Sequence, residues 1–298
     1  MRILVTGASG FVGGHLARTL AGAGHEVRAL TRRADRYRGS GTPVAGAIGD
    51  RASLTAALEG CDVAYYLVHS LAEPDFAERD RAGARAFAGA AAAAGTPQVV
   101  YLGGLGDDAD DLSAHRRNRR EVEAILAAGT PTTSLRAGVV IGDGSTAWEI
   151  LRQLVERLPA MVTPRWVQTR TQPIALADAL RFLAGVAGVP EAVGRTYEIG
   201  GPEPLTYREM MTTVAGLTGR RRLIVPVPVL SPGLSSQWLR LVTDVDLPTA
   251  RALVDSMTND VVVRDRSIEA LVGHTTMTFR VAAEIALADR AERLDPAA

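Results

Sequence analysis

Three glycines near the start of the chain have the spacing of a turn that binds a diphosphate. Gly7, Gly10 and Gly13 follow the apolar run Ile3-Leu4-Val5 and precede a helical pattern of apolar residues. In such a turn the first glycine permits a tight bend, the second lets a pyrophosphate approach the backbone, and the third allows close helix–strand packing. A flexible turn in a glycine-rich chain is the alternative, but the strand before it and the helix after it favour a dinucleotide site. The predicted contacts are Gly7, Ser9, Gly10, Phe11, Val12 and Gly13.

Basic side chains follow the second expected strand, residues 26–30. Enzymes that use NAD usually place an acid at this point to hold the adenosine ribose hydroxyls, whereas this chain has Thr31-Arg32-Arg33, with Arg36 and Arg38 behind. Guanidinium groups suit a 2′-phosphate because they form charge-assisted, often bidentate hydrogen bonds. We therefore predict NADP(H), preferred over NAD(H), with Arg32 and Arg33 as cofactor contacts. A solvated basic loop is the alternative, and the chain, which has no lysine, is rich in arginine.

Strand and helix patterns alternate five times before residue 142, and this alternation predicts an α/β fold with a doubly wound parallel sheet. Asp50 closes the third strand and could also cap the helix that we expect at 53–59. The expected strands are 3–5, 26–30, 44–48, 61–68, 98–102 and 135–141.

The pattern loosens beyond residue 142. Trp148 and Trp166 could line a pocket or belong to the core, and we favour the core. Helices are expected at 148–158, 176–186, 206–217, 234–242, 248–257 and 279–293, and extended segments at 166–174, 197–199 and 223–229.

The spacing Thr6-Gly7-x-x-Gly10-x-x-Gly13 resembles that of the short-chain dehydrogenase/reductase superfamily, in its extended and atypical branches. Over most of its length the chain is similar to the atypical NAD(P)H-binding branch related to NmrA-like proteins. The resemblance implies a Rossmann domain over residues 1–200, with an excursion at 143–170, and a small substrate-binding cap over 201–298. It also implies that Asp50 approaches the adenine and that the backbone after the sixth strand contacts the nicotinamide. The cofactor contacts expected beyond the turn are Asp50, Leu67, Val68, Arg119, Ala137, Gly138 and Val139.

The residues that move protons in ordinary members of the superfamily are missing from this chain. Those enzymes use a Ser after the fifth strand and a Tyr-x-x-x-Lys on the next helix. Here the Ser position holds Gly103-Gly104, and the helix carries His115 in place of Tyr and Arg119 in place of Lys. Because the chain contains no lysine, the usual pair cannot be rebuilt from another position.

Four side chains are candidates for the missing roles. His115 could donate or accept a proton because its unperturbed pKa of about 6.5 lies near working pH. Arg119 keeps a positive charge for the ribose hydroxyls but cannot relay protons. His69 is a competing acid, and Ser113 could orient either histidine. In the alternative interpretation, His115 begins a surface helix and Arg119 pairs with Glu123 four residues on.

Composition limits the possible partners and compartment. The 298 residues carry zero net charge, which implies neither a nucleic acid nor an anionic membrane as partner. A single cysteine, Cys61, cannot form an internal disulfide and suits the reducing cytoplasm. We find no apolar run of membrane-spanning length, expect no cleaved leader and no metal site, and leave the oligomeric state open.

Two functions fit these features. The first is an NADPH-dependent reductase that acts on a small, partly apolar carbonyl or conjugated substrate. The second is a non-catalytic NADP(H)-binding redox sensor of the NmrA-like type, suggested by the missing Ser, Tyr and Lys. An assembly role is a weaker third possibility.

Overall fold

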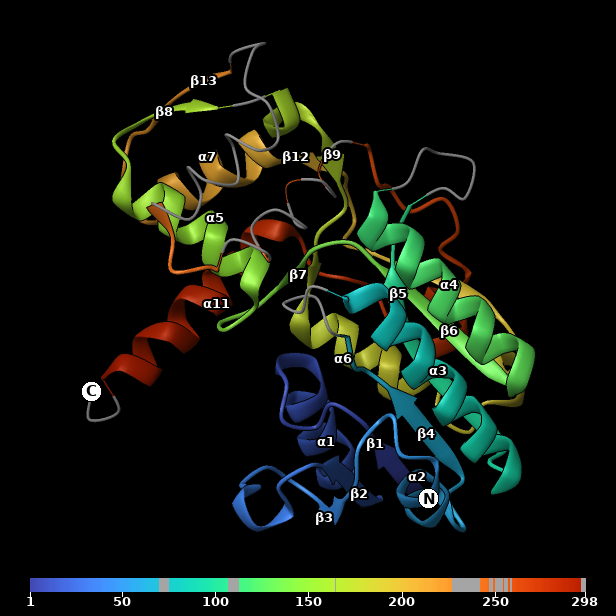
Figure 1. Cartoon of the computed structure of the whole chain (residues 1–298). Helices are drawn as coiled ribbons and strands as arrows, with labels where there is room; N and C mark the ends of the chain where they lie inside the picture. The colour runs from blue at the N-terminus through green and yellow to red at the C-terminus, as the bar shows by residue number, and fades with distance from the viewer. Residues whose placement is uncertain are drawn as a thin grey trace.

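The predicted parallel sheet is confirmed, with seven strands in the order β11-β6-β5-β4-β1-β2-β3 (Figure 1). Every neighbouring pair in this sheet is parallel. The strand order reverses between β1 and β4, which creates the crevice where open α/β sheets bind ligands. The strands are β1 (Arg2–Val5), β2 (Glu26–Thr31), β3 (Thr42–Ala45), β4 (Val63–Tyr66), β5 (Gln98–Gly104), β6 (Thr132–Ala137) and β11 (Thr196–Ile199). The computed structural model describes residues 1–69, 75–106, 113–163, 165–226, 242–246, 249, 254, 257 and 259–295.

Helices cover both faces of the sheet, as a doubly wound fold requires (Figure 1). One apolar cluster includes Leu16 and Phe182 on one face, and another includes Phe87 and Leu126 on the opposite face. Burial on both faces explains why Ile3-Leu4-Val5 is uninterrupted by polar residues. The helices are α1 (Phe11–Gly22) and α6 (Leu176–Gly185) on the first face, and α2 (Arg51–Leu58), α3 (Phe76–Ala93) and α4 (Ala114–Gly129) on the second.

A second apolar core lies beside the sheet, at the upper left of Figure 1. Trp148 and Trp166 are buried in it, which confirms the core interpretation of both tryptophans. Its helices are α5 (Thr146–Arg157), α7 (Tyr207–Leu217) and α11 (Phe279–Leu294). Its short strands are β7 (Val140–Ile141) with β10 (Ile174–Ala175), β8 (Ala160–Thr163) with β13 (Leu223–Pro226), and β9 (Arg170–Thr171) with β12 (Leu205–Thr206). By contrast, α10 (Ser267–Val272) packs against α6 and β11 of the larger unit.

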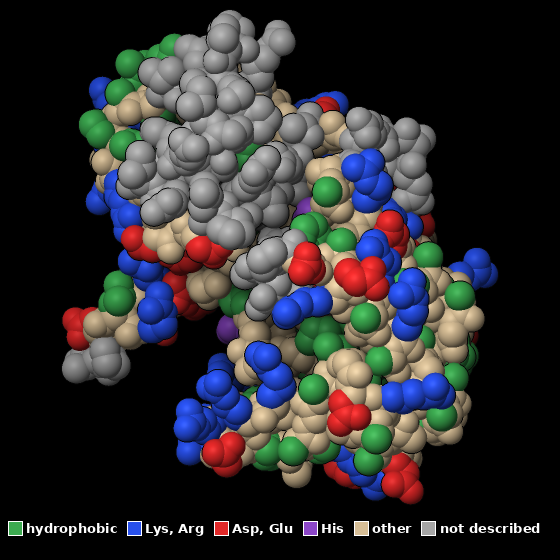
Figure 2. All heavy atoms as spheres, in the orientation of Figure 1, with side chains coloured by type: hydrophobic (Ala, Val, Ile, Leu, Met, Phe, Trp, Pro, Cys, Tyr) green, Lys and Arg blue, Asp and Glu red, His purple; other side chains and the backbone are tan. Residues whose placement is uncertain are grey.

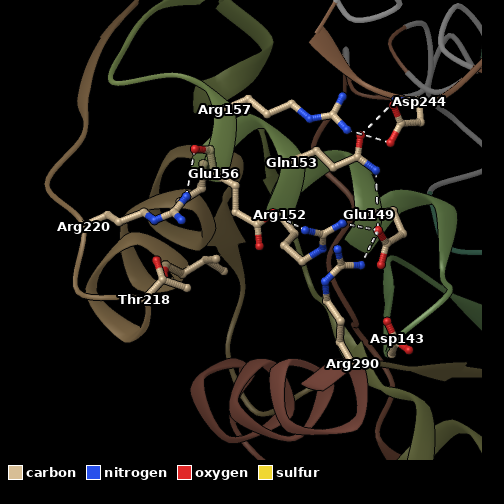
Figure 3. Close-up of polar contacts among 12 residues, drawn as sticks. Asp143, Glu149, Arg152, Gln153, Glu156, Arg157, Thr218, Arg220, Asp244 and Arg290 are labelled. Carbon is tan, nitrogen blue, oxygen red and sulfur yellow. Dashed lines mark hydrogen bonds and ion pairs between the residues drawn. The ribbon is translucent and has the colours of Figure 1, made fainter. Parts of the chain in front are cut away.

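A network of charged side chains joins α11 to α5 (Figure 3). Arg152 is 3% exposed and forms ion pairs with Glu149 and Glu156, and Arg290 of α11 reaches Glu149 at 3.7 Å. One turn further along α11, Arg293 donates to Asp143 and lowers the pKa of that carboxyl. These contacts hold the chain segment that precedes α5.

That segment also touches the start of α1. A Cβ built on Gly142 would lie 3.1 Å from the Phe11 ring, so the two segments are in close contact. The charged network therefore helps to hold the second core against the glycine turn.

Several predicted boundaries are wrong. The sixth strand was expected at 135–141, but β6 ends at Ala137 and β7 pairs with β10 in a different sheet. The chain leaves the main sheet at Gly138, where a Cβ would lie only 2.9 Å from the Gln172 carbonyl oxygen. The first three residues of the expected extended segment 166–174 belong instead to the 3-10 helix η2 (Arg165–Gln168).

Other elements agree more closely with expectation. The third strand begins and ends earlier than the predicted 44–48, and the fourth is shorter than the predicted 61–68. The caps of α2 by Asp50 and of α7 by Thr206 are confirmed. The expected helices 234–242 and 248–257 lie almost entirely outside the described residues, as does 223–229 beyond 226. Among the described helices, none is both long and apolar enough to cross a bilayer.

Candidate active site

A cavity of about 1570 Å³ lies at the carboxyl ends of the sheet strands. Small-molecule pockets usually measure about 300–1,000 Å³, so this cavity has room for more than one small ligand. Figure 2 shows it as a hollow with arginine side chains gathered on its lower rim. It extends from the loop after β2, over the glycine turn, to Thr171 and Tyr207 of the second core.

The glycine turn has the shape that a diphosphate needs. Gly7 adopts a φ of +66°, and its carbonyl oxygen accepts a 2.8 Å hydrogen bond from the Gly10 N–H. A Cβ on Gly13 would lie 2.2 Å from the Gly7 oxygen, so the third glycine serves close packing. A Cβ on Gly10 would meet only that oxygen, at 3.1 Å, and would otherwise point into open space. All six predicted turn residues line the cavity: Gly7, Ser9, Gly10, Phe11, Val12 and Gly13.

The arginines after β2 line the same cavity, beyond the turn. The Arg38 guanidinium donates to two backbone carbonyl oxygens of its own loop, and Arg36 lies 3.9 Å from Asp35. Arg32 and Arg33 are exposed and form no side-chain ion pair within the described residues. Their two guanidinium groups therefore stand exposed along this end of the cavity, and their contact with a 2′-phosphate stays a prediction.

Asp50 takes the simpler of its two predicted roles. Its side chain accepts a 3.1 Å hydrogen bond from the Ala52 N–H and caps α2. Hydrogen bonds from Ser53 and Ala52 lower the pKa of this carboxyl. Residues 46–49 line the cavity whereas Asp50 does not, so its contact with the adenine stays a prediction. The other predicted contacts that line the cavity are Leu67, Val68, Arg119, Ala137, Gly138 and Val139.

Two histidines meet at the far end of the cavity. His69 follows β4, His115 lies in the first turn of α4, and both line the cavity wall. Burial, then the charges of Arg119 and His69, lower the pKa of His115 to about 3. The Nδ1 atom of His115 is buried and has no hydrogen-bond partner among the described residues. The expectation of a surface histidine is thus wrong, and the imidazole is neutral at pH 7. Burial and Arg119 also lower the pKa of His69.

Arg119 is directed into the same wall. Its guanidinium lies 5.0 Å from the centroid of the Tyr101 ring and donates to the Leu102 carbonyl oxygen. The alternative pairing with Glu123 is wrong. That carboxylate is 8% exposed and accepts hydrogen bonds from Arg120 and Arg136, because it faces β6 rather than the cavity.

Ser113 is placed as a helix cap. Its hydroxyl accepts a 3.3 Å hydrogen bond from the Arg116 N–H at the start of α4. Ser113 is not among the cavity-lining residues. The structure therefore brings together His115, His69 and Arg119 but leaves Ser113 outside the wall that they form.

Sequence reasoning missed several lining residues at this end, among them Arg116, Thr171 and Tyr207. Thr171 and Tyr207 come from the second core, and no local motif marks them. The described lining residues include no Asp or Glu. Their charged side chains are Arg32, Arg33, Arg36, Arg38, Arg79, Arg116 and Arg119. The cavity is therefore suited to anions at both ends.

The neutral state of His115 gives a direct prediction. Between pH 5 and pH 8 we expect no titration of its ring in NMR spectra, because burial and Arg119 disfavour the imidazolium. A His115→Gln variant assigns the signal by its disappearance. A midpoint near the unperturbed value of about 6.5 would contradict the burial that the structure gives this ring.

Comparison with known families agrees with this geometry. The family described as NAD(P)H-binding matches residues 7–157, which span the glycine turn and the strands around the cavity. The chain belongs to the NAD(P)H-binding family. This family agrees with the cofactor class that the resemblance to short-chain dehydrogenases/reductases implied.

Named relatives of this NAD(P)H-binding protein are reductases. It is 34% identical over 267 residues, 85% of each chain, to the (4-alkanoyl-5-oxo-2,5-dihydrofuran-3-yl)methyl phosphate reductase of Streptomyces griseus. Its fold is similar to that of the Citrobacter sp. triphenylmethane reductase complexed with NADP(H), with a TM-score of 0.77 and 19% identity, over 96% and 100% of the two chains. The Escherichia coli NADPH-dependent quinone oxidoreductase complexed with NADPH has a TM-score of 0.76 and 22% identity, over 95% and 98%.

Proposed function

We propose that this protein is a reductase that prefers NADPH to NADH and acts on a small conjugated carbonyl compound bearing an anionic group. One observation carries the proposal: a single cavity passes over the glycine turn, has arginines at both ends, and has no carboxylate among its described lining residues. Arg32 and Arg33 serve the 2′-phosphate of the cofactor, and the turn serves its pyrophosphate.

The described lining of the far end of the cavity is basic. Arg116 and Arg119 line it together with two histidines. A phosphate or carboxylate on the substrate would form charge-assisted hydrogen bonds with this lining. The relative from Streptomyces griseus is named for a phosphorylated unsaturated lactone, which is a compound of this class.

The second core is the substrate-binding cap in this proposal. Residues 143–170 and much of the chain from 201 to 226 build it, while α10 belongs with the sheet. The cofactor would supply the hydride, and the cap and the arginines would orient the substrate and exclude water. A cytoplasmic location is part of this proposal, because the single cysteine, Cys61, is a free and buried thiol, which suits a reducing compartment.

Two measurements on the purified full-length protein test the proposal. The first is titration with NADPH and NADH, for which we expect clearly tighter binding of NADPH. The second is NADPH oxidation with a panel of quinones, unsaturated lactones and their phosphate esters. We expect turnover, with the phosphate esters favoured in kcat/KM. Equal binding of the two cofactors would contradict the assignment of the arginines.

A redox sensor is the second candidate. It is favoured by the absence of the usual Ser, Tyr and Lys, and by a neutral His115 that cannot deliver a proton as an imidazolium. Tight NADPH binding without turnover of any panel member would support the sensor and contradict the reductase.

A further inference from the structure

We propose that Tyr207 donates the proton that completes reduction of the substrate, in place of the tyrosine missing from α4. This inference rests on the proposed reductase function. Beyond the glycine turn and the loop after β2, the described lining residues with exchangeable protons on uncharged side chains are His69, His115, Ser145, Thr146, Thr171, Tyr207 and Thr249. Of these, Tyr207 has the position and the acid–base chemistry for the step.

The path of the cofactor locates the reacting end. Arginines after β2 hold the adenosine phosphate, and the glycine turn after β1 holds the pyrophosphate. The nicotinamide half must then continue across the ends of β4, β5 and β6. At the end of β6, a Cβ on Gly138 would lie 3.1 Å from the Thr171 Oγ1 atom, so Thr171 is in contact with the chain at this end of the cavity.

Strand pairing brings Tyr207 to the same place. In the antiparallel pair β9–β12, Thr171 lies opposite Leu205 and Arg170 opposite Thr206. Tyr207 directly follows as the first residue of α7, whose start is fixed by the reciprocal hydrogen bonds of Thr206 and Glu209. The position of Tyr207 is therefore fixed by the β9–β12 strand pairing that precedes it and by the capped start of α7 that follows it.

The surroundings of Tyr207 hold its ring still. The side chain is 8% exposed, and its ring packs edge-on against Trp166 at a centroid distance of 5.7 Å. It still lines the cavity, from the wall opposite the sheet. The Thr171 side chain is buried next to the phenol, close enough to affect the pKa of Tyr207.

The charges nearby suit a phenol that gives up a proton only during the reaction. Burial raises the pKa of Tyr207 to about 12, while the Arg116 guanidinium and the Thr171 side chain act in the opposite direction. The phenol is thus protonated at neutral pH. Arg116 and the positive end of α7 favour the phenolate that proton transfer leaves behind.

The step is balanced without a further reactant. As the hydride reaches the electrophilic carbon, a C–H bond forms and a π bond breaks, and its electrons move onto the carbonyl oxygen. That oxygen takes the proton from the Tyr207 Oη atom. The substrate is reduced by the two electrons of the hydride, the cofactor that loses this hydride is oxidised, and the phenolate regains a proton from water.

Tyr207→Phe tests this role because it keeps the ring against Trp166 and removes only the hydroxyl. With the panel member that the wild-type protein turns over fastest, we expect kcat to fall about 100-fold. KM, the NADPH dissociation constant and the melting temperature should stay near wild type. We also expect the solvent deuterium isotope effect on kcat to change, which a merely structural hydroxyl would not produce.

Tyr197→Phe is the matched control. The Tyr197 hydroxyl donates to the Glu191 carbonyl oxygen, away from the cavity, so its loss should leave kcat unchanged. Retention of wild-type kcat by Tyr207→Phe, in an enzyme that turns over the panel, would overturn the role of Tyr207 alone. A wild-type protein that turns over no panel member would instead overturn the reductase function, and this inference with it.

Discussion

We expect Gly10→Val to abolish tight NADPH binding and to leave the protein folded. Gly10 lines the cavity, and a side chain there would meet within the protein only the Gly7 carbonyl oxygen, at 3.1 Å. Its extended backbone, with φ −87° and ψ 175°, tolerates a β-branched residue. The added methyl groups would occupy the place of the pyrophosphate. Loss of two charge-assisted hydrogen bonds weakens binding by about 3 kcal/mol, or about 100-fold.

Two other glycines separate this effect from general damage. A Cβ on Gly22, at the exposed end of α1, would meet nothing within 4 Å, so Gly22→Ala should bind NADPH like wild type. A Cβ on Gly13 would lie 2.2 Å from the Gly7 oxygen, so Gly13→Ala should lose stability and binding together. Fluorescence titration and thermal unfolding of the three variants provide the test. NADPH affinity within about threefold of wild type in Gly10→Val would exclude the turn as the diphosphate site.

The second large effect is expected from the double variant Arg32→Ala/Arg33→Ala. Hydrogen bonds to a charged group contribute about 1.5–3 kcal/mol, so the NADPH dissociation constant should rise about 10- to 100-fold. NADH lacks the 2′-phosphate, so its affinity should not change. The discrimination between the cofactors in the wild-type protein should also shrink as salt is raised, because both guanidinium groups are exposed.

Arg18→Ala is the matched control for this experiment. Arg18 is an exposed arginine of α1 that does not line the cavity, and its loss should leave both affinities unchanged. Thr31→Asp tests the same site in the opposite direction, because an acid at the end of β2 should favour NADH. An equal loss of NADPH and NADH affinity in the double variant would show that the two arginines do not bind the 2′-phosphate of NADPH.

The cofactor half of the cavity was largely predictable because its signals are local. The glycine spacing, the arginines after β2 and the caps at Asp50 and Thr206 depend on residues close together in the chain. Their consequences follow from backbone conformation and helix-end hydrogen bonding, which neighbouring residues determine. The structure places the predicted turn residues along one cavity wall.

The catalytic half was less predictable because long-range packing builds it. Periodicity placed Arg119 four residues before Glu123, but Arg136 on the neighbouring strand binds that carboxylate. A solvent-exposed histidine has a pKa near neutrality, whereas burial lowers the pKa of His115 to about 3. Neither effect can be read from neighbouring residues.

By itself, the sequence determined the parallel α/β sheet, the glycine turn after its first strand and the absence of the usual Ser, Tyr and Lys, because each depends on residue type at short spacing. Only the tertiary structure decided that the chain leaves the sheet at Gly138, that a second core closes the cavity, and that Tyr207 lines it. Those features depend on packing and strand pairing between segments that are distant in sequence, so the residues near each position do not determine them.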